Sequence, residues 1–151
     1  MFQQQARRVV NQFKEAGVTK IIALTPHSAE MFRQVYSRFI DNFDFEVIPY
    51  VSTVAEALKK SGMELFLPKP LTLTLHDPCH LARSLNVVEE PREVLQAIRN
   101  LDFREVASNK ESTLRCGAPC EVVYPEFSEL IAAKRVAELS ATGAEAAAMT
   151  E

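Results

Sequence analysis

The residues best suited to chemistry are three cysteines, grouped in two short motifs. In "HDPCH", Cys79 and His80 follow an alternating apolar run, and in "RCGAPC", Cys116 and Cys120 enclose a Gly-Ala-Pro turn. Thiolates are preferred ligands of zinc and of iron–sulfur clusters, and an activated thiolate is itself a redox group. The pattern predicts a metal or redox site if the fold brings residue 79 close to 116 and 120.

Each motif also has a structural interpretation. Free cysteine is among the most buried residue types and C-x₃-C is not a strong metal spacing, so Cys116 and Cys120 could be core residues around a turn. His76 is interpreted first as a strand-end residue bonded to a nearby carbonyl, and second as a ligand or proton carrier. Asp77, which precedes a proline, suits a turn or cap. Arg115 could lower a thiol pKa, bind an anion or be a surface charge.

Composition and charge narrow the class of protein. Hydrophobic residues make up 47% and charged residues 25% of the chain, as in soluble globular proteins. The net charge of −3 gives no indication of the basic surface that usually binds nucleic acid, so no nucleic-acid partner is expected. The apolar stretches are too short to cross a bilayer, and the polar opening "MFQQQARR" is unlike a signal peptide. The short apolar stretches, the polar opening and the odd number of cysteines together predict a cytoplasmic protein without membrane insertion.

Hydrophobic periodicity predicts helices that alternate with strands. The expected helices cover 2–16, 26–40, 53–62 (with a capping box at Thr53 and Glu56), a segment from Pro91 that includes Ile98, and 125–143. The expected strands are 21–24, 45–51, 71–75, 103–106 and 144–149, and 65–70 is expected to be an irregular connector. The last helix is expected to bury Phe127, Leu130, Ile131 and Val136.

This alternation predicts an α/β fold with three layers, a mostly parallel sheet and helices on both faces. Ligands of such sheets bind beyond the carboxyl ends of the strands. The loops "TPHS" (25–28), "HDPCH" (76–80) and "RCGAPC" (115–120) are all candidates for that edge. His27 and His80 would lie in first turns of helices there, facing solvent or the site. The shared edge is what would bring Cys79 near the other two cysteines.

The sequence also contains an internal echo. "GVTKIIALT", from Gly17, and "GAEAAAMTE", from Gly143, each run from a glycine that ends a helix through a short apolar strand. Such a pattern is common in α/β proteins, so alone it is weak support for a repeat.

The segment "HDPCHLARSLNVVEEPREVLQAI" with "LDFREVASNKESTLRCGAP" resembles the second cysteine-rich CCG repeat of the heterodisulfide reductase family of iron–sulfur oxidoreductases, which includes glycolate and lactate oxidase subunits. "GVTKIIALTPHSAEMF" is similar to the end of the first repeat, and "FEVIPYVSTVAEALKKSG" to the segment that links the repeats. The resemblance implies a first, cysteine-depleted repeat over 1–62, a linker over 63–70 and a second repeat over 71–151, together one compact domain.

Several positions depart from the family pattern. Thr25 and Ser28 occupy both cysteine positions of the first C-P-x-C, and Arg115 replaces the first cysteine of Cys-Cys-Gly. Cys120 stands where the family usually has glycine. By the echo, Glu151 falls where the last C-P-x-C would begin. The first repeat has therefore lost its ligands, and the second lacks its final pair.

The resemblance implies electron transfer, or disulfide and thiol redox chemistry, through a 4Fe-4S cluster, with other redox subunits as partners. The candidate ligands are Cys79, Cys116, Cys120 and His80. Because a cubane cluster or structural zinc takes four ligands, we expect a fragment of a longer polypeptide that completes the site. Whether the chain is itself an enzyme stays open; it would be an oxidoreductase subunit if its parent binds a cluster.

Other interpretations belong to other classes of function. The chain could be a degenerate CCG module that holds structural zinc or no metal and serves as a protein-interaction domain. It could also be a thiol enzyme in which His80 activates Cys79, although the sequence shows no orienting partner. A homodimer is expected where apolar surface would otherwise stay exposed.

Overall fold

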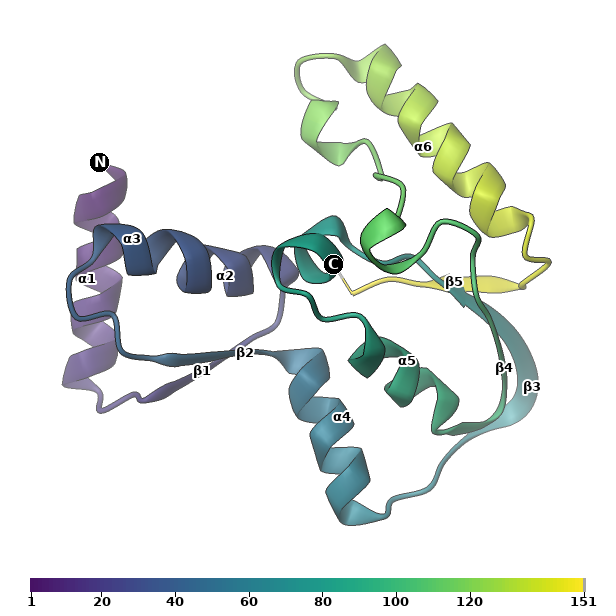
Figure 1. Ribbon diagram of the computed structural model, residues 1–151, viewed down its shortest axis with the longest axis horizontal. Helices are drawn as coiled ribbons and strands as arrows, with labels where there is room; N and C mark the ends of the chain where they lie inside the picture. The colour runs from purple at the N-terminus through teal and green to yellow at the C-terminus, as the bar shows by residue number, and fades with distance from the viewer. Residues whose placement is uncertain (151) are drawn as a thin grey trace.

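Parallel strands and their connecting helices make up the fold in the computed structural model, which describes residues 1–150 (Figure 1). The helices are α1 (Phe2–Glu15), α2 (Pro26–Glu30), α3 (Ser37–Phe39), α4 (Tyr50–Ser61), α5 (Glu89–Gln96) and α6 (Pro125–Ser140). The π-helical turns are η1 (Met31–Tyr36) and η2 (His80–Ser84), and the 3₁₀ turns are η3 (Lys110–Ser112) and η4 (Ala118–Cys120). The strands are β1 (Lys20–Ala23), β2 (Glu46–Pro49), β3 (Leu65–Leu75), β4 (Ile98–Arg104) and β5 (Ala146–Ala148). The expectation for Glu151 lies outside the described residues.

The strands divide between two parallel sheets. β1 pairs with β2 in one sheet, and β3 lies between β4 and β5 in the other. Figure 1 shows α1, α2 and α3 beside the first sheet, and α5 and α6 beside the second. The α/β class and the parallel pairing predicted from the sequence are confirmed. The carboxyl end of β3 therefore meets the loops that follow β4, as the site requires.

The internal echo is present in three dimensions. Helix α1 ends before Gly17, which has a φ of 70°, and β1 follows; α6 ends before Gly143, which has a φ of 68°, and β5 follows. A left-handed residue after a helix favours glycine because a Cβ atom there is strained. The first half of the chain (residues 1–62) and the second half (residues 71–150) thus share a helix, a left-handed glycine and a short strand.

Helix α4 begins earlier than the capping box predicted. The helix starts at Tyr50, directly after β2, and Thr53 lies within its first turn. The early start places Val51 and Ala55 one turn apart on the buried face. Burial of that face, rather than the local Thr–Glu pattern, determines where the helix begins.

Strand β3 includes the segment predicted to be an irregular connector. It extends from Leu65 through both prolines to Leu75, and its pairing with β4 shifts register between Phe66 and Leu71. Proline cannot donate a ladder hydrogen bond, and the irregularity accommodates both prolines. Because Leu65 pairs with Ile98, β4 also starts earlier than predicted, and Ile98 belongs to the strand rather than to the preceding helix.

Helix α6 packs with a face other than the predicted one. Phe127, Leu130 and Val136 are exposed and Ile131 is half-buried, whereas Ser128 and Arg135 are the buried residues of the helix. The predicted apolar stripe is therefore wrong. Polar contacts of the buried pair, described below, hold α6 in place.

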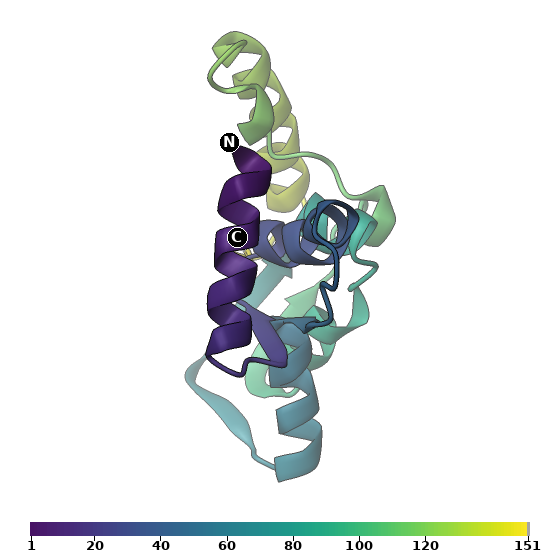
Figure 2. The same ribbon diagram turned by 90° about the vertical axis from the view of Figure 1, so that its left-hand side faces the viewer.

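Two apolar clusters hold the remaining helices. In the first, α1 buries Ala6 and Val10 against Ile40, where α1 crosses the α2–α3 segment (Figure 2). In the second, Val51 of α4 packs against Leu81 of the second half, with Val87 nearby. The second cluster joins the two halves next to Cys79. None of the helices described has the length and apolar character needed to span a bilayer.

Candidate functional site

The "HDPCH" motif begins where β3 ends, and its first two side chains are almost completely buried. His76 is 3% and Asp77 1% exposed, whereas Cys79 is partly exposed at the N-terminal end of η2. The motif therefore combines a buried anchor with an accessible thiol.

Asp77 is the centre of this anchor. Its carboxylate accepts two hydrogen bonds from Arg92, at 2.9 and 2.8 Å, and one from the backbone N–H of Lys110 at 2.8 Å. Its backbone carbonyl accepts a bond from the Thr113 hydroxyl at 3.0 Å. Asp77 thus ties the end of β3 to α5 and to the loop that leads to Cys116.

Arg92 compensates this buried carboxylate. It also donates two hydrogen bonds to Glu105, at 2.8 and 2.9 Å, and one to the backbone carbonyl of Val88 at 2.6 Å. Burial alone lowers the pKa of Arg92, but the hydrogen bonds to Asp77 and Glu105 outweigh it, and the pKa is raised. The guanidinium is therefore a permanent cation between two carboxylates.

His76 is held by protein partners, in accord with the strand-end interpretation, although its ring partner is an arginine rather than a carbonyl. Its Nδ1 accepts a hydrogen bond from Nε of Arg135 at 2.8 Å, and its backbone N–H donates to Ala148 of β5 at 2.9 Å. An imidazole that accepts at Nδ1 carries no proton there. Nδ1 of His76 is thus bonded to Arg135 of α6 and is not available as a ligand atom in this arrangement.

Arg135 attaches α6 to the same loops. It donates to the Ser108 carbonyl at 3.0 Å, to Glu138 at 2.6 Å and to the Thr113 hydroxyl at 3.2 Å. Burial raises the pKa of Glu138, but hydrogen bonds from Ser108 and Arg135 lower it by more, so the net pKa lies below its ordinary value. These bonds explain why α6 buries a cation instead of its apolar stripe.

A tight turn holds Cys116 against the start of α6. The next residue, Gly117, has a φ of 94°, and a Cβ atom there would lie 2.5 Å from the backbone oxygen of Ser128. The Ser128 hydroxyl donates to the Gly117 carbonyl at 3.0 Å, and the Cys120 N–H donates to the same oxygen at 2.9 Å. Only glycine fits this position, so the Cys-Gly pair is a steric requirement of the turn.

Cys79 and Cys116 line one pocket of about 280 Å³, together with His80, His27, Ala118 and Pro119. Both thiols are free and partly exposed. The structure thus brings together two of the three predicted cysteines and the predicted histidine. Cys120 is also a free thiol, but it is not among the residues that line this pocket. Arg115 is exposed beside Cys116.

His80 is oriented by two residues of the first half. Its Nδ1 pairs with the carboxylate of Glu30, and its ring lies against that of His27, with centroids 3.6 Å apart. A histidine held at one nitrogen by a carboxylate presents the other nitrogen in a fixed direction. The sequence predicted "TPHS" at this edge but not the role of Glu30, because no local pattern links that residue to a histidine fifty positions away.

Thr25 and Ser28, which stand where the family pattern of the resemblance has cysteines, bond to each other. Thr25 caps α2: its side-chain oxygen accepts from the Ser28 N–H at 3.2 Å, and its hydroxyl donates to the Ser28 side chain at 3.0 Å. This loop therefore contributes a helix cap and, through His27, an imidazole at the pocket. It contributes no thiol.

The donors fit a four-thiolate cluster only in part. Two cysteines and two histidines line the pocket, but within residues 1–150 no three His, Cys, Asp or Glu side chains are grouped so that they could hold a metal ion. A cubane cluster takes four protein ligands. As arranged here, this chain can offer such a cluster two thiolates, and no complete ligand set.

The comparisons with known proteins agree with these motifs. The cysteine-rich domain family (CCG) matches residues 73–150. The chain is 32% identical over 126 residues to the probable iron-sulfur-binding oxidoreductase FadF of Bacillus subtilis, covering 83% of this chain and 18% of that protein. It is 29% identical over 143 residues to one of the subunits of the dihydromethanophenazine:CoB–CoM heterodisulfide reductase of Methanosarcina acetivorans, covering 93% of this chain and 35% of that protein.

A third relative, the EtfAB:quinone oxidoreductase of Syntrophomonas wolfei, is 29% identical over 118 residues, which are 78% of this chain and 16% of that protein. The chain thus spans between about a sixth and a third of the length of these relatives. No solved structure matches it significantly. Because the family match covers the "HDPCH" and "RCGAPC" motifs and more than half of the sequence, the chain belongs to the cysteine-rich CCG domain family.

Proposed function

We propose that this chain is the cysteine-rich domain of an iron–sulfur oxidoreductase and that Cys79 and Cys116 supply thiolates to its redox group. One observation carries the proposal: these two cysteines, far apart in the sequence, line the same partly open pocket. The names of the relatives, an iron-sulfur-binding oxidoreductase and a component of a heterodisulfide reductase, support the same class of function. A bound 4Fe-4S cluster would supply one-electron transfer.

The role of the surrounding residues is to position the thiols. The Asp77–Arg92 pair fixes the turn before Cys79, and the left-handed Gly117 fixes the backbone after Cys116. Ala118 and Pro119 give the pocket an apolar wall, which limits access of water to the thiols. The remaining ligands, the electron donor and the acceptor belong to partner domains or subunits in a cytoplasmic complex.

Reconstitution tests this proposal. The purified chain is incubated anaerobically with iron and sulfide in the presence of a small thiol, which can occupy coordination positions that the chain leaves open. We expect visible charge-transfer absorption with bound iron and acid-labile sulfide, and loss of both in Cys79→Ser and in Cys116→Ser. Cys120→Ser is the matched control and should retain them. Absorption that survives both substitutions, or that only Cys120→Ser removes, would contradict the proposal.

Zinc is a second candidate, supported by the types of residue at the same pocket. Two cysteines and two histidines line it, and these are the residue types of structural zinc sites, although within residues 1–150 no three of them are grouped, as arranged here, so that they could hold a metal ion. In that case the chain is a degenerate module with a structural or protein-interaction role. A colourless protein with one bound zinc ion, lost in Cys79→Ser and in His80→Ala, would favour this alternative over the iron–sulfur function.

A further inference from the structure

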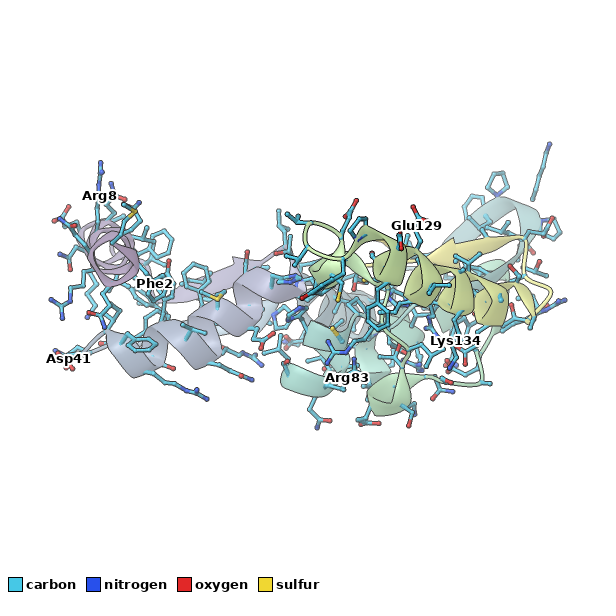
Figure 3. The ribbon with its side chains drawn as sticks, turned by 90° about the horizontal axis from the view of Figure 1, so that it is seen from above. Phe2, Arg8, Asp41, Arg83, Glu129 and Lys134 are labelled. Carbon is cyan, nitrogen blue, oxygen red and sulfur yellow. The ribbon has the colours of Figure 1, made fainter. Side chains whose placement is uncertain are left out.

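Strand β1 has one edge that pairs with no strand among residues 1–150. It forms a two-stranded sheet with β2 and has no second neighbour in that part of the chain. Figure 1 shows no ribbon other than β2 running alongside it. In Figure 3 the first half, with Phe2 and Arg8 at its outer end, extends away from the second half, which carries Glu129 and Lys134. The second half therefore supplies no strand for this open edge.

The hydrogen bonds between β1 and β2 show which backbone groups face the open edge. The carbonyl of Thr19 accepts a hydrogen bond from the Glu46 N–H at 3.0 Å, so it points toward β2. Successive residues of a strand direct their N–H and C=O groups to opposite edges. The backbone groups of Ile21 therefore face β2, and those of Lys20 and Ile22 face the open edge.

The side chains of β1 do little to protect this edge. Natural proteins usually blunt a free edge with proline, a bulge, charged side chains or a covering element. Residues 20–24 contain no proline, and the one charged residue, Lys20, pairs with Glu46 of β2 at 3.0 Å. Ile22 is 49% and Leu24 73% exposed. The edge is thus accessible to another strand and bordered by apolar side chains.

The internal echo shows what fills the equivalent edge of the second half. Ile22 follows Gly17 by five residues, as Ala148 follows Gly143. The Ala148 carbonyl accepts a hydrogen bond from the His76 N–H at 2.9 Å, so it faces β3. The Ile22 carbonyl is its counterpart and faces the open edge of β1. The same edge is therefore paired with β3 in the second half and open in the first.

We propose that the open edge of β1 binds a parallel β-strand from another polypeptide segment, with alternating apolar residues like those of Leu71–Leu75. In β3, positions 73–75 pair with 146–148 of β5, so the corresponding residues of the added strand would pair with 20–22. The next residue of that strand would donate its N–H to the Ile22 carbonyl. In strand addition of this kind, backbone hydrogen bonds give affinity and alternate side chains give specificity.

The pairing of β3 indicates that the added strand comes from elsewhere. β3 is the strand of this chain with the required pattern, but β4 and β5 already occupy both of its edges. All strand pairs within residues 1–150 are parallel, so the same direction is expected for the added strand. The proposal is independent of the redox group at the pocket, because it depends only on the backbone of β1.

Amide hydrogen exchange, followed by NMR, tests this proposal on the whole chain. The probe is a synthetic peptide with the sequence of residues 70–78, PLTLTLHDP. At a peptide concentration of about ten times its Kd, the Ile22 N–H should exchange about tenfold more slowly. The Ile21 N–H, which faces β2, should exchange at an unchanged rate. Ile22→Pro removes the N–H on the open edge and should abolish binding, since proline is tolerated in an edge strand.

A control peptide keeps the test independent of how well the Ile22→Pro variant folds. In PLTLPLHDP, proline replaces the second threonine, whose counterpart Thr74 lies two residues before His76 and faces β5 in the same way. This peptide should not protect Ile22. Fusion of each peptide before Met1 through a flexible Gly–Ser linker of about 20 residues raises its effective concentration to the millimolar range. The first fusion should protect the Ile22 N–H and the proline fusion should not.

Three results would overturn the proposal. The first is unchanged exchange of the Ile22 N–H in both the peptide titration and the fusion. The second is protection confined to elements other than β1. The third is an Ile22 N–H already protected in the chain alone, together with the mass of a dimer in light scattering, because a second copy would then cover the edge.

Discussion

The guanidinium of Arg92 binds both carboxylate oxygens of Asp77 in a position where the two side chains are only 5% and 2% exposed. Asp77 belongs to the D-P-C motif of the family, and its burial gives this turn residue a definite role. It holds the end of β3 against α5 and against the loop that leads to Cys116. The thiol that follows is positioned by a charge pair that never faces the pocket.

We expect Asp77→Asn to destabilise the protein strongly. The substitution removes one charge of a buried pair and leaves Arg92 with one compensating carboxylate, which typically costs about 3–5 kcal/mol. The free energy of unfolding, measured with denaturant, should fall by that order. Lys60→Gln, which breaks the exposed pair with Glu56, should lower the free energy of unfolding far less, because solvent screens both charges. Equal effects of the two substitutions would show that the Asp77 network does not stabilise the fold.

We expect Gly117→Ala to disturb both stability and the Cys116 thiol. The new Cβ atom would meet the Ser128 backbone oxygen at 2.5 Å, in addition to the strain of a left-handed backbone. Gly62→Ala is the control, since Gly62 has a φ of 64° but no atom within 4 Å, and it should cost only about 1–2 kcal/mol. A larger loss of unfolding free energy in Gly117→Ala, with a changed rate of Cys116 alkylation, would fit this account. Equal losses would not.

The pKa of Glu138 predicts part of the pH dependence of stability. The pKa is lowered in the folded protein, so the folded state favours the ionised carboxylate more than the unfolded state does. This contribution is fully present above the unfolded value, near 4.5, and is lost as the pH falls through the lower folded pKa. In urea titrations from pH 7 downward, the wild type should lose its advantage over Glu138→Gln below about pH 4.5. Parallel pH profiles for the two proteins would contradict this assignment.

The Thr25 cap gives a prediction for the first half. Thr25→Ala removes the acceptor for the Ser28 N–H and should cost about 0.5–2 kcal/mol of unfolding free energy. Ser28→Ala leaves that hydrogen bond in place and removes only the contact between the two side chains. We therefore expect a smaller loss in thermal and chemical unfolding for Ser28→Ala. A larger loss for Ser28→Ala would mean that the cap is not what stabilises α2.

Several features were predicted correctly from local signals. Gly17 and Gly143 indicated the ends of α1 and α6, Thr25-Pro26 indicated the start of α2, and alternation of strands and helices indicated the α/β class. The expected parallel sheet also predicted that the loops with Cys79, Cys116 and Cys120 share one edge; Cys79 and Cys116 line one pocket, and Cys120 does not line it. These features depend on a few neighbouring residues, whose preferences the tertiary structure does not override.

Features that depend on distant contacts were missed. The start of α4 follows from burial of Val51, and the length of β3 follows from its pairing with β4 across two prolines. The orientation of α6 depends on Arg135, a residue that periodicity alone assigns to the surface. His80 is held by Glu30 from the other half of the chain. Each of these depends on a partner that no window of ten to fifteen residues contains.

The position of β3 between β4 and β5 has a consequence for the order of folding. β4 follows β3 after one short helix, but β5 pairs with it across some seventy residues, so its loop-closure entropy is larger. We therefore expect β5 to dock last. Until it does, the hydrogen bond from the His76 N–H to the Ala148 carbonyl is not formed, so the end of β3 that leads to Cys79 is not yet fully bonded. Any group that bound beside Cys79 at that stage would meet a strand end that is not yet fixed.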